Sequence, residues 1–306
     1  MDVLTLPKTF PLPPPDDHDR ACLALSALAA DRPVIIDGLA FGALDAAFLA
    51  GARHRWVALI HHPLALETGH DGATAHRLCE SEKAALAAAS AVIVTSPSTA
   101  RCLVADYGVA EERITMALPG TARVARSSGS RPAPHLLSVA TLTPRKGHDV
   151  LVAALARIAA LEWTAVWVGS PSRCPATAEA VRHAVVEAGL ARRIEIAGEV
   201  AADELERIYR RSDIFVLPSR HEGYGMAFAE ALAHGLPVVG CAVGALPETV
   251  PQDAGVLVPP DDVPALAGAL ETLLVDRSRR RVMAQAAWRH ASSLPRWDDA
   301  AARVEA

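Results

Sequence analysis

The feature that most constrains this chain is a strand–turn–helix unit at residues 213–234. Residues 213–217 are apolar and partly β-branched and end at a proline, which predicts a buried strand. Residues 226–234 are rich in Ala and Leu and are followed by a glycine, which predicts a helix. Gly223 and Gly225 lie in the turn between them. Because the first amides of a helix have no partner within it, this turn is suited to binding an anion.

Two glutamates accompany this turn: Glu222 stands at its mouth, and Glu230 follows within the predicted helix. Carboxylates beside a bare phosphate would repel it. A ligand with both phosphate and hydroxyl groups could accept hydrogen bonds from the amides through its phosphate and donate hydrogen bonds to the carboxylates through its hydroxyls. That combination predicts a nucleotide-sugar, and the structural alternative is a capped helix with a solvated surface glutamate.

Short apolar runs alternate with helical patterns along the whole chain, which implies parallel sheets with helices on both faces. The predicted strands are residues 3–6, 33–37, 56–60, 91–95 and 113–117, then 135–140, 164–169, 193–197, 213–217, 237–240 and 255–258. The predicted helices are residues 20–30, 44–52, 75–89 and 99–107, then 149–160, 176–188, 203–211, 226–234, 263–276 and 279–292, with a terminal helix after residue 295. Residues 123–134 are rich in Ser, Gly and Pro and predict a linker between two α/β domains.

Composition excludes several classes of protein. The chain has 306 residues, which suits two domains, and a net charge of −5, which does not favour nucleic-acid binding. No run approaches the roughly 18 apolar residues of a transmembrane segment. Five scattered cysteines without paired spacing predict a reduced, cytoplasmic protein without a metal site. Neither half shows G-x-G-x-x-G after its first strand, which argues against a nicotinamide enzyme.

Other polar residues also follow predicted strands. Arg145, Lys146 and Gly147 come between strand 135–140 and the next helix, and Lys146 is one of only three lysines. Two cations and a helix N-terminus could meet one anionic group there. His61 and His62 end strand 56–60. Since ligands of doubly wound domains bind at the carboxyl ends of strands, these residues are site candidates, and ordinary surface or core roles are the alternative.

The second half resembles glycosyltransferase family 4, which has the GT-B fold of two Rossmann-like domains facing each other across a cleft. The matching stretches are A-T-L-T-P-R-K-G-H-D (140–149), A-G-E-V (197–200), A-D-E-L-E-R-I-Y (202–209), the run from Asp213 to Gly240 that contains S-R-H-E-G-Y-G, and G-A-L-P-E (244–248). The first half is similar through V-A-L-I-H-H-P (57–63), V-I-V-T-S-P-S-T (92–99) and I-T-M-A-L-P-G (114–120), and the end through R-W-D-D-A (296–300).

The resemblance implies a retaining transferase that moves a sugar from a nucleotide-diphosphate sugar to an acceptor hydroxyl on a small molecule, lipid or glycan. Glu222 would contact donor-sugar hydroxyls near the reacting carbon, and Glu230 would hold the ribose hydroxyls. Lys146, with Arg145 as a helper, would neutralise the diphosphate.

The same resemblance implies that the amides of Gly225 and Met226 bind the phosphate and that Val200 lies near the base. His61 matches the first-domain histidine that reaches the donor sugar, with His62 as the alternative. We expect no metal and no other cofactor, because no Asp-x-Asp ends a strand and no His/Cys pair has ligand spacing.

We expect residues 1–130 to form the acceptor-side domain, residues 131–289 the donor-binding domain, and residues 290–306 to pack back onto the first. Compared with the family, the chain starts at what looks like a second strand, so the first domain would lack the central strand and the glycine-rich loop. An alternative function is therefore a non-catalytic relative that binds nucleotide-sugar or a partner protein through its second half.

Overall fold

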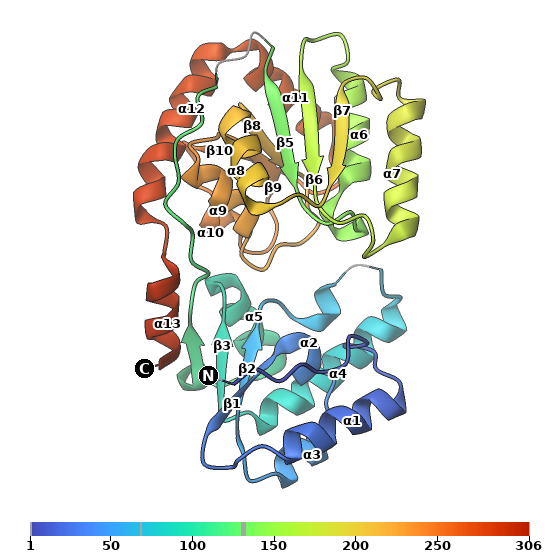
Figure 1. Cartoon of the computed structure of the whole chain (residues 1–306), viewed down its shortest axis with the longest axis vertical. Coiled ribbons are helices and arrows are strands. Elements are labelled where there is room, and N and C mark those ends of the chain that lie inside the picture. Colours follow the sequence, from blue (N-terminus) through green and yellow to red (C-terminus); the bar gives the residue numbers. More distant parts are fainter. Residues whose placement is uncertain (1, 68, 130–132, 306) are drawn as a thin grey trace. The chain divides into compact units, whose positions relative to one another are not determined.

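The computed structural model describes residues 2–67, 69–129 and 133–305, and the chain divides into two compact units (Figure 1). The first unit is Met1–Leu118 with Asp299–Ala306, and the second is Pro119–Asp298. The division therefore lies before the boundary that we expected at residue 130. At the other end of the chain, the terminal residues grouped with the first unit begin at Asp299, within the stretch 290–306 that we expected to return there.

The first unit consists of four strands and the helices that connect them. The strands are β1 (Pro33–Asp37), β2 (Arg55–Ile60), β3 (Ala91–Val94) and β4 (Ile114–Met116). The helices are α1 (Pro15–Ser26), α2 (Gly38–Phe41), α3 (Ala46–Gly51), α4 (Gly72–Ala88) and α5 (Pro97–Tyr107), with short 3₁₀ turns η1 (Leu64–Leu66) and η2 (Glu111–Arg113). Helix α1 begins before the expected residue 20, because Pro15 occupies its first turn and two aspartates follow.

The strands of the first sheet are all parallel and pair in the order β1-β2-β3-β4. The strand predicted at residues 3–6 is wrong: these residues form no strand, and Val3 is 81% exposed. The sheet that the structure describes has no gap in its middle, because each strand bonds directly to the next one in sequence. The four described strands are therefore contiguous, and the loss of a strand relative to the family stays a prediction.

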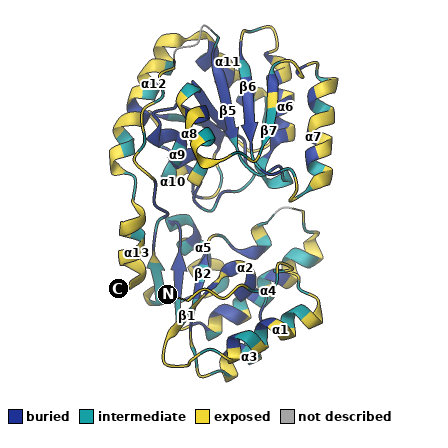
Figure 2. Ribbon diagram, viewed as in Figure 1, coloured by how far each residue is buried: buried dark blue, intermediate teal, exposed yellow. Residues whose placement is uncertain are grey.

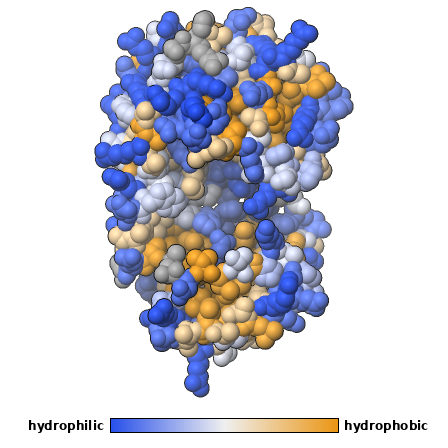
Figure 3. Space-filling view, in the orientation of Figure 1, coloured by the Kyte–Doolittle hydropathy of each residue, from blue (hydrophilic) through white to orange (hydrophobic). Residues whose placement is uncertain are grey.

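Helices α1 to α5 all contribute to one core cluster with β1, β2 and β3. Strands that follow one another across a sheet through right-handed crossovers place their connecting helices on the same face. Ile36 of β1 joins this cluster, whereas its neighbour Ile35 points the other way and is 45% exposed. Figure 3 shows hydrophobic side chains gathered on the surface over β1 and β2.

The second unit begins with a strand–helix series whose strands are β5 (His135–Val139), β6 (Thr164–Val168), β7 (Ile194–Gly198), β8 (Ile214–Leu217), β9 (Val238–Cys241) and β10 (Gly255–Val258). Its helices are α6 (His148–Arg157), α7 (Pro175–Glu187), α8 (Ala202–Arg211), α9 (Met226–Ala233), α10 (Leu246–Thr249), α11 (Val263–Val275) and α12 (Arg277–His290), with 3₁₀ turns η3 (Pro144–Lys146) and η4 (Ala291–Ser293). Helix α13 (Trp297–Glu305) ends the chain. All six strands predicted for this half are confirmed.

The second sheet is parallel throughout, with the order β10-β9-β8-β5-β6-β7. Alternate residues of β5 point to opposite faces: Leu136 packs with α6, α7 and α11, and Leu137 packs with α8, α9 and α12. Both faces are therefore covered, as a parallel sheet requires, and the inner strands β9, β8, β5 and β6 are buried along most of their length (Figure 2).

The segment predicted as a linker contains no helix or strand where it is described, and residues 130–132 lie outside the described residues. It is nevertheless bonded to the second unit. The Ser127 amide donates to the carbonyl of His234 at 2.8 Å, and the Ser127 hydroxyl donates to the carbonyl of Ser212 at 2.7 Å. These bonds explain why the division of the chain falls before this segment.

Across the described ranges, no helix is both long and apolar enough to cross a membrane.

One carboxyl group lies inside the first unit. Glu82 of α4 is fully buried, and one of its oxygens accepts a hydrogen bond from the Leu64 amide at 2.9 Å. Burial raises the pKa of Glu82 from 4.5 to about 7. Below pH 4.5 the group is protonated in both the folded and the unfolded chain. As the pH rises from 4.5 to about 7, the unfolded chain ionises first, so stability falls.

We predict that Glu82 lowers the unfolding free energy of the wild type by about 3 kcal/mol as the pH rises from 4.5 to 7. The Glu82→Gln variant should show no such decrease, because glutamine does not ionise. Its side-chain oxygen can still accept from the Leu64 amide. Hydrogen exchange of the β2 amides, measured at pH 5 and pH 8, would report the stability of the first unit separately from that of the second. Equal pH dependence in the wild type and the variant would contradict this prediction.

Candidate functional site

The candidates Arg145, Lys146 and Glu222 of the second unit lie on two loops that leave neighbouring strands. Strand β5 pairs with β8 in parallel, with Leu136 opposite Ile214 and Leu137 opposite Phe215. Both strands therefore end at the same edge of the sheet. The loop after β5 carries Arg145 and Lys146, and the loop after β8 carries Glu222. Strand order thus brings together residues that are 76 positions apart in the sequence.

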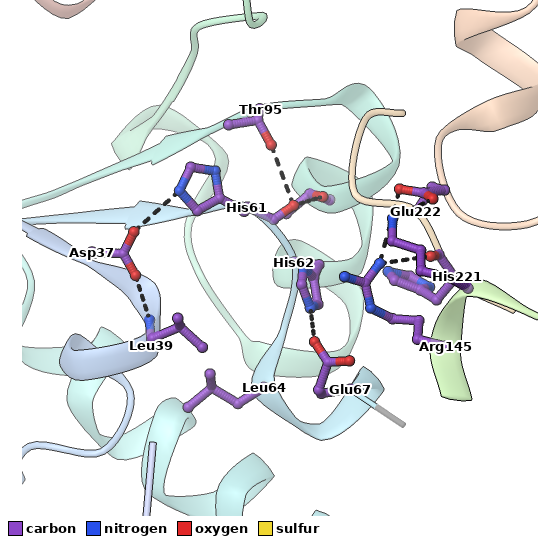
Figure 4. A network of polar contacts seen from close by, with 12 residues as sticks. Asp37, Leu39, His61, His62, Leu64, Glu67, Thr95, Arg145, His221 and Glu222 are labelled. Atoms are coloured by element: carbon purple, nitrogen blue, oxygen red, sulfur yellow. Dashed lines mark hydrogen bonds and ion pairs between the residues drawn. The ribbon is translucent and has the colours of Figure 1, made fainter. Parts of the chain in front are cut away.

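Lys146 and Glu222 form the central contact of this edge. The Lys146 ammonium donates to Glu222 Oε1 at 2.7 Å, and the Ser219 hydroxyl donates to the same oxygen at 2.6 Å. Arg145 donates from Nη1 to the His221 carbonyl at 3.0 Å and lies 3.9 Å from Glu222 Oε2 (Figure 4). The sequence-predicted cations and the first glutamate are therefore in direct contact.

Glu222 is only 6% exposed. Burial acts to raise the pKa of its carboxyl group, but the Lys146 ammonium, the Ser219 hydroxyl and the more distant Arg145 outweigh burial and lower that pKa. The side chain is therefore ionised at neutral pH. An ionised carboxylate only accepts hydrogen bonds, so it suits ligand hydroxyls.

Close backbone contacts hold the two loops. At Gly147 the backbone φ is +66°, and a Cβ there would lie 2.1 Å from the Pro218 carbonyl oxygen. At Gly244, in the loop after β9, φ is +52° and a Cβ would lie 2.1 Å from the Glu222 carbonyl oxygen. The Ala245 amide donates to that same oxygen at 3.0 Å. The backbone of Glu222 is thus fixed by a third loop.

Helix α9 begins beside Glu222. Gly225 precedes its first residue with φ of +89°, and a Cβ there would meet the Leu246 side chain at 2.5 Å. Met226 opens the helix and is 45% exposed. The Thr249 hydroxyl donates to the Tyr224 carbonyl at 2.7 Å and so fixes the turn before the helix. The anion-binding role that the sequence assigned to the amides of Gly225 and Met226 stays a prediction.

Glu230 occupies a different environment from Glu222. Its Oε2 accepts a hydrogen bond from the Tyr209 hydroxyl of α8 at 2.9 Å, and the Tyr209 ring stacks on His234 at 4.7 Å. Burial raises the pKa of Glu230, although the Tyr209 bond opposes this shift. Tyr209 therefore orients the carboxylate that we assigned to ribose hydroxyls.

Val200 follows strand β7 and packs against the same core cluster as α8 and α9. The end of β7 is held by a bond from the Gly169 amide to the Gly198 carbonyl at 2.8 Å. Among the described contacts, none joins Val200 to Lys146 or Glu222, so its assignment near the base stays a prediction.

His61 and His62 lie in the first unit and have different partners there. His61 Nε2 lies 3.2 Å from Asp37 Oδ2 at the end of β1, and the hydrogen bond to His61 is the main cause that lowers the pKa of Asp37. His62 Nε2 lies 3.2 Å from Glu67 Oε2 (Figure 4). Their assignment to the donor sugar stays a prediction.

Sequence reasoning missed Ser219, Thr249 and Tyr209. A hydroxyl group close to a loop carboxylate is a usable signal for Ser219, which stands three residues before Glu222. Thr249 and Tyr209 act on residues 25 and 21 positions away, which no local pattern indicates. Across the described residues, no group of three or more His, Cys, Asp or Glu side chains is arranged to hold a metal ion, and metal independence stays a prediction.

We predict that Gly244→Ala lowers unfolding free energy by about 1–3 kcal/mol, because alanine is strained at positive φ and its Cβ overlaps the Glu222 carbonyl. Urea denaturation measures this loss. Gly268→Ala is the matched control: its Cβ meets no atom within 4 Å on α11, so it should stabilise by about 0.5–1 kcal/mol. A Gly244→Ala variant as stable as wild type would show that the three loops are not packed as described.

Comparison with known proteins gives one family model, described as "Glycosyl transferases group 1", which matches residues 133–276. The chain is 33% identical over 236 residues to a D-inositol 3-phosphate glycosyltransferase of Corynebacterium efficiens, covering 71% of this chain and 55% of that protein. It is 30% identical over 279 residues to a D-inositol 3-phosphate glycosyltransferase of Catenulispora acidiphila, covering 83% and 66%. The chain thus spans little more than half to two thirds of the length of these relatives.

A third relative is the GDP-mannose-dependent alpha-(1-6)-phosphatidylinositol monomannoside mannosyltransferase of Mycobacterium tuberculosis, 34% identical over 182 residues, covering 56% of this chain and 46% of that protein. Among solved structures, sucrose-phosphate synthase from Thermosynechococcus elongatus superposes with a TM-score of 0.81 at 26% identity, covering 95% of this chain and 77% of that one. Anabaena HepE in complex with UDP and glucose superposes with a TM-score of 0.77 at 20% identity, covering 95% and 80%. Residues 133–276 therefore form a domain of the group 1 glycosyl transferases, in a chain with the GT-B fold.

Proposed function

We propose that this chain is a retaining glycosyltransferase of the family 4 type, which transfers a sugar from a nucleotide-diphosphate sugar to an acceptor hydroxyl. The observation that carries this proposal is the contact of Lys146 with Glu222 at 2.7 Å beside the glycine that starts α9. It joins a cation, a helix N-terminus and an ionised acceptor of hydrogen bonds. A nucleotide-sugar offers a partner to each of them.

In this proposal the diphosphate binds to the Lys146 ammonium and to the amides of Gly225 and Met226. Lys146 carries three donors, so it can bind a phosphate oxygen while it holds Glu222. Arg145, which contacts the loop of Glu222 through the His221 carbonyl, adds a second positive charge. These cations and amides stabilise the charge that develops on the leaving phosphate, and no metal is needed.

The sugar and the nucleoside bind through the two glutamates. Glu222 accepts hydrogen bonds from donor-sugar hydroxyls, since its carboxylate is ionised at neutral pH. Glu230, oriented by Tyr209, accepts from the ribose hydroxyls, and Val200 lies near the base. His61 of the first unit, with His62 as the alternative, contacts the donor sugar.

In the reaction, the acceptor hydroxyl attacks from the side on which the phosphate leaves, so the configuration at the sugar carbon is retained. The departing phosphate oxygen takes the hydroxyl proton. The names of the relatives, which include inositol phosphate and phosphatidylinositol glycosyltransferases, support a polyol, glycan or lipid-linked hydroxyl as acceptor. The five cysteines are free, which fits a reducing compartment such as the cytoplasm.

The proposal is tested by thermal shift and transfer assays with UDP-, GDP- and ADP-sugars. We expect one nucleotide family to stabilise the protein, and its sugar to be transferred or hydrolysed with retention in the presence of EDTA. Binding without transfer to any acceptor in a panel of polyols and glycolipids would indicate a non-catalytic binding protein. Activity that EDTA abolishes and manganese or magnesium restores would refute metal independence.

We predict that Lys146→Ala weakens nucleoside-diphosphate binding by about 1.5–3 kcal/mol, because it removes a charge-assisted contact. Glu222→Gln should mainly lower turnover, because this residue contacts the sugar. Calorimetry measures the first effect and initial rates the second. Lys83→Ala is the control for Lys146, since Lys83 pairs with Glu80 on the surface of the first unit. Unchanged nucleotide affinity in Lys146→Ala, or unchanged turnover in Glu222→Gln, would contradict the roles assigned.

A further inference from the structure

Arg220 stands in the same loop as Glu222 but does not contact it in any recorded interaction. Its side chain is 26% exposed and donates to groups on three other segments of the second unit. Nη1 and Nη2 bond the two oxygens of Asp149 in α6 at 3.1 and 2.7 Å, and Nε bonds Asp261 Oδ1 at 2.8 Å. Nη1 also donates to the Pro144 carbonyl.

The backbone of Arg220 adds a further bond to the same turn. Its amide donates to the Arg145 carbonyl at 2.7 Å. Two successive carbonyls of η3, those of Pro144 and Arg145, are therefore both held by Arg220. The next residue of this turn is Lys146, whose ammonium reaches Glu222. The position of the Lys146 backbone, and therefore the reach of its side chain, depends on the bonds that hold this turn.

Asp261, the second carboxylate partner of Arg220, has an uncommon backbone conformation. It lies between β10 and α11 with φ of +59°, the only positive φ recorded for a non-glycine residue in the described part of the chain. Aspartate adopts such a conformation more readily than most residues, and surrounding contacts offset its remaining cost. The Asp261 carboxylate is the anchor for Arg220 Nε, so the loop after β10 is tied to the turn after β5.

We propose that Arg220 is a positioning residue for the phosphate-binding turn: it holds η3 between α6 and the β10–α11 loop, so that Lys146 meets the donor diphosphate. This inference rests on the proposed function. Arg220 contributes no net positive charge to the site, because two carboxylates, Asp149 and Asp261, surround its one guanidinium. Its effect on an anion is therefore geometric, and only a planar fork can make these bonds at once.

The charge-conserving variant Arg220→Lys separates geometry from charge. We expect it to fold normally, because Asp149 and Asp261 are 61% and 57% exposed and exposed pairs add little stability. We expect it to weaken binding of UDP or GDP, whichever the wild type prefers, by about tenfold in calorimetry. Asp261→Asn tolerates positive φ and keeps a weaker acceptor, so it should weaken binding in the same direction but less.

Arg207→Lys is the matched control, because Arg207 also bonds two carboxylates, Asp203 at 2.7 Å and Glu204 at 2.9 Å, but within helix α8. It should change nucleotide affinity by less than about twofold. If Arg220 acts through Lys146, Arg220→Lys should have little further effect in a Lys146→Ala background. Full additivity of the two changes, or wild-type affinity in Arg220→Lys, would overturn the proposal.

Hydrogen exchange without any ligand gives a readout that does not depend on the proposed function. Peptides covering residues 142–149 should exchange faster in Arg220→Lys than in the wild type, and not in Arg207→Lys. If the wild type binds no nucleoside diphosphate, the proposed function fails, and this exchange measurement still decides whether Arg220 holds the turn. Unchanged exchange in these peptides would show that it does not.

Discussion

The contact between the Lys146 ammonium and the buried Glu222 carboxylate is the interaction on which the edge of the second unit depends. A carboxylate that is 6% exposed is costly unless charges and hydrogen bonds compensate it. Lys146 and Ser219 supply that compensation at 2.7 and 2.6 Å. Because Lys146 follows β5 and Glu222 follows β8, the contact exists only if these two strands are neighbours. The strand order of the sheet is therefore a requirement for the ion pair at the site.

Backbone packing makes this contact rigid. Gly147 and Gly244 each bring a loop so close to the chain around Glu222 that a Cβ would lie 2.1 Å from a carbonyl oxygen. Only glycine permits both the positive φ and the short approach. Three loops, after β5, β8 and β9, are thus packed through their backbones at the carboxyl ends of buried inner strands. A site built in this way is organised before any ligand binds, which limits the reorganisation required in a reaction.

The second unit could be predicted from sequence because its signals are local. Strand 214–217, the turn with Gly225 and the helix from Met226 follow one another within a short stretch, and the cations Arg145 and Lys146 stand directly after a strand. The prediction of a strand at residues 3–6 was wrong because a strand requires a hydrogen-bonded partner as well as a suitable local composition. In the structure, residues 3–6 pair with no strand. Tyr209, Arg220 and Asp261 were missed as site residues because their roles come from contacts between segments, such as Arg220 with Asp149, 71 positions away.

The charge state of Glu222 decides which group can take the acceptor proton in the proposed reaction. Lys146 lowers the pKa of this carboxyl group despite its burial, so Glu222 stays ionised and has no proton to donate to the leaving phosphate. As a base it is also poor, because Lys146 and Ser219 already bond its Oε1 and stabilise the anion. A carboxylate held in this way accepts hydroxyl hydrogen bonds without titrating. In the proposed reaction the departing phosphate oxygen is the base, and its proton uptake would couple bond formation to bond cleavage on one face of the sugar.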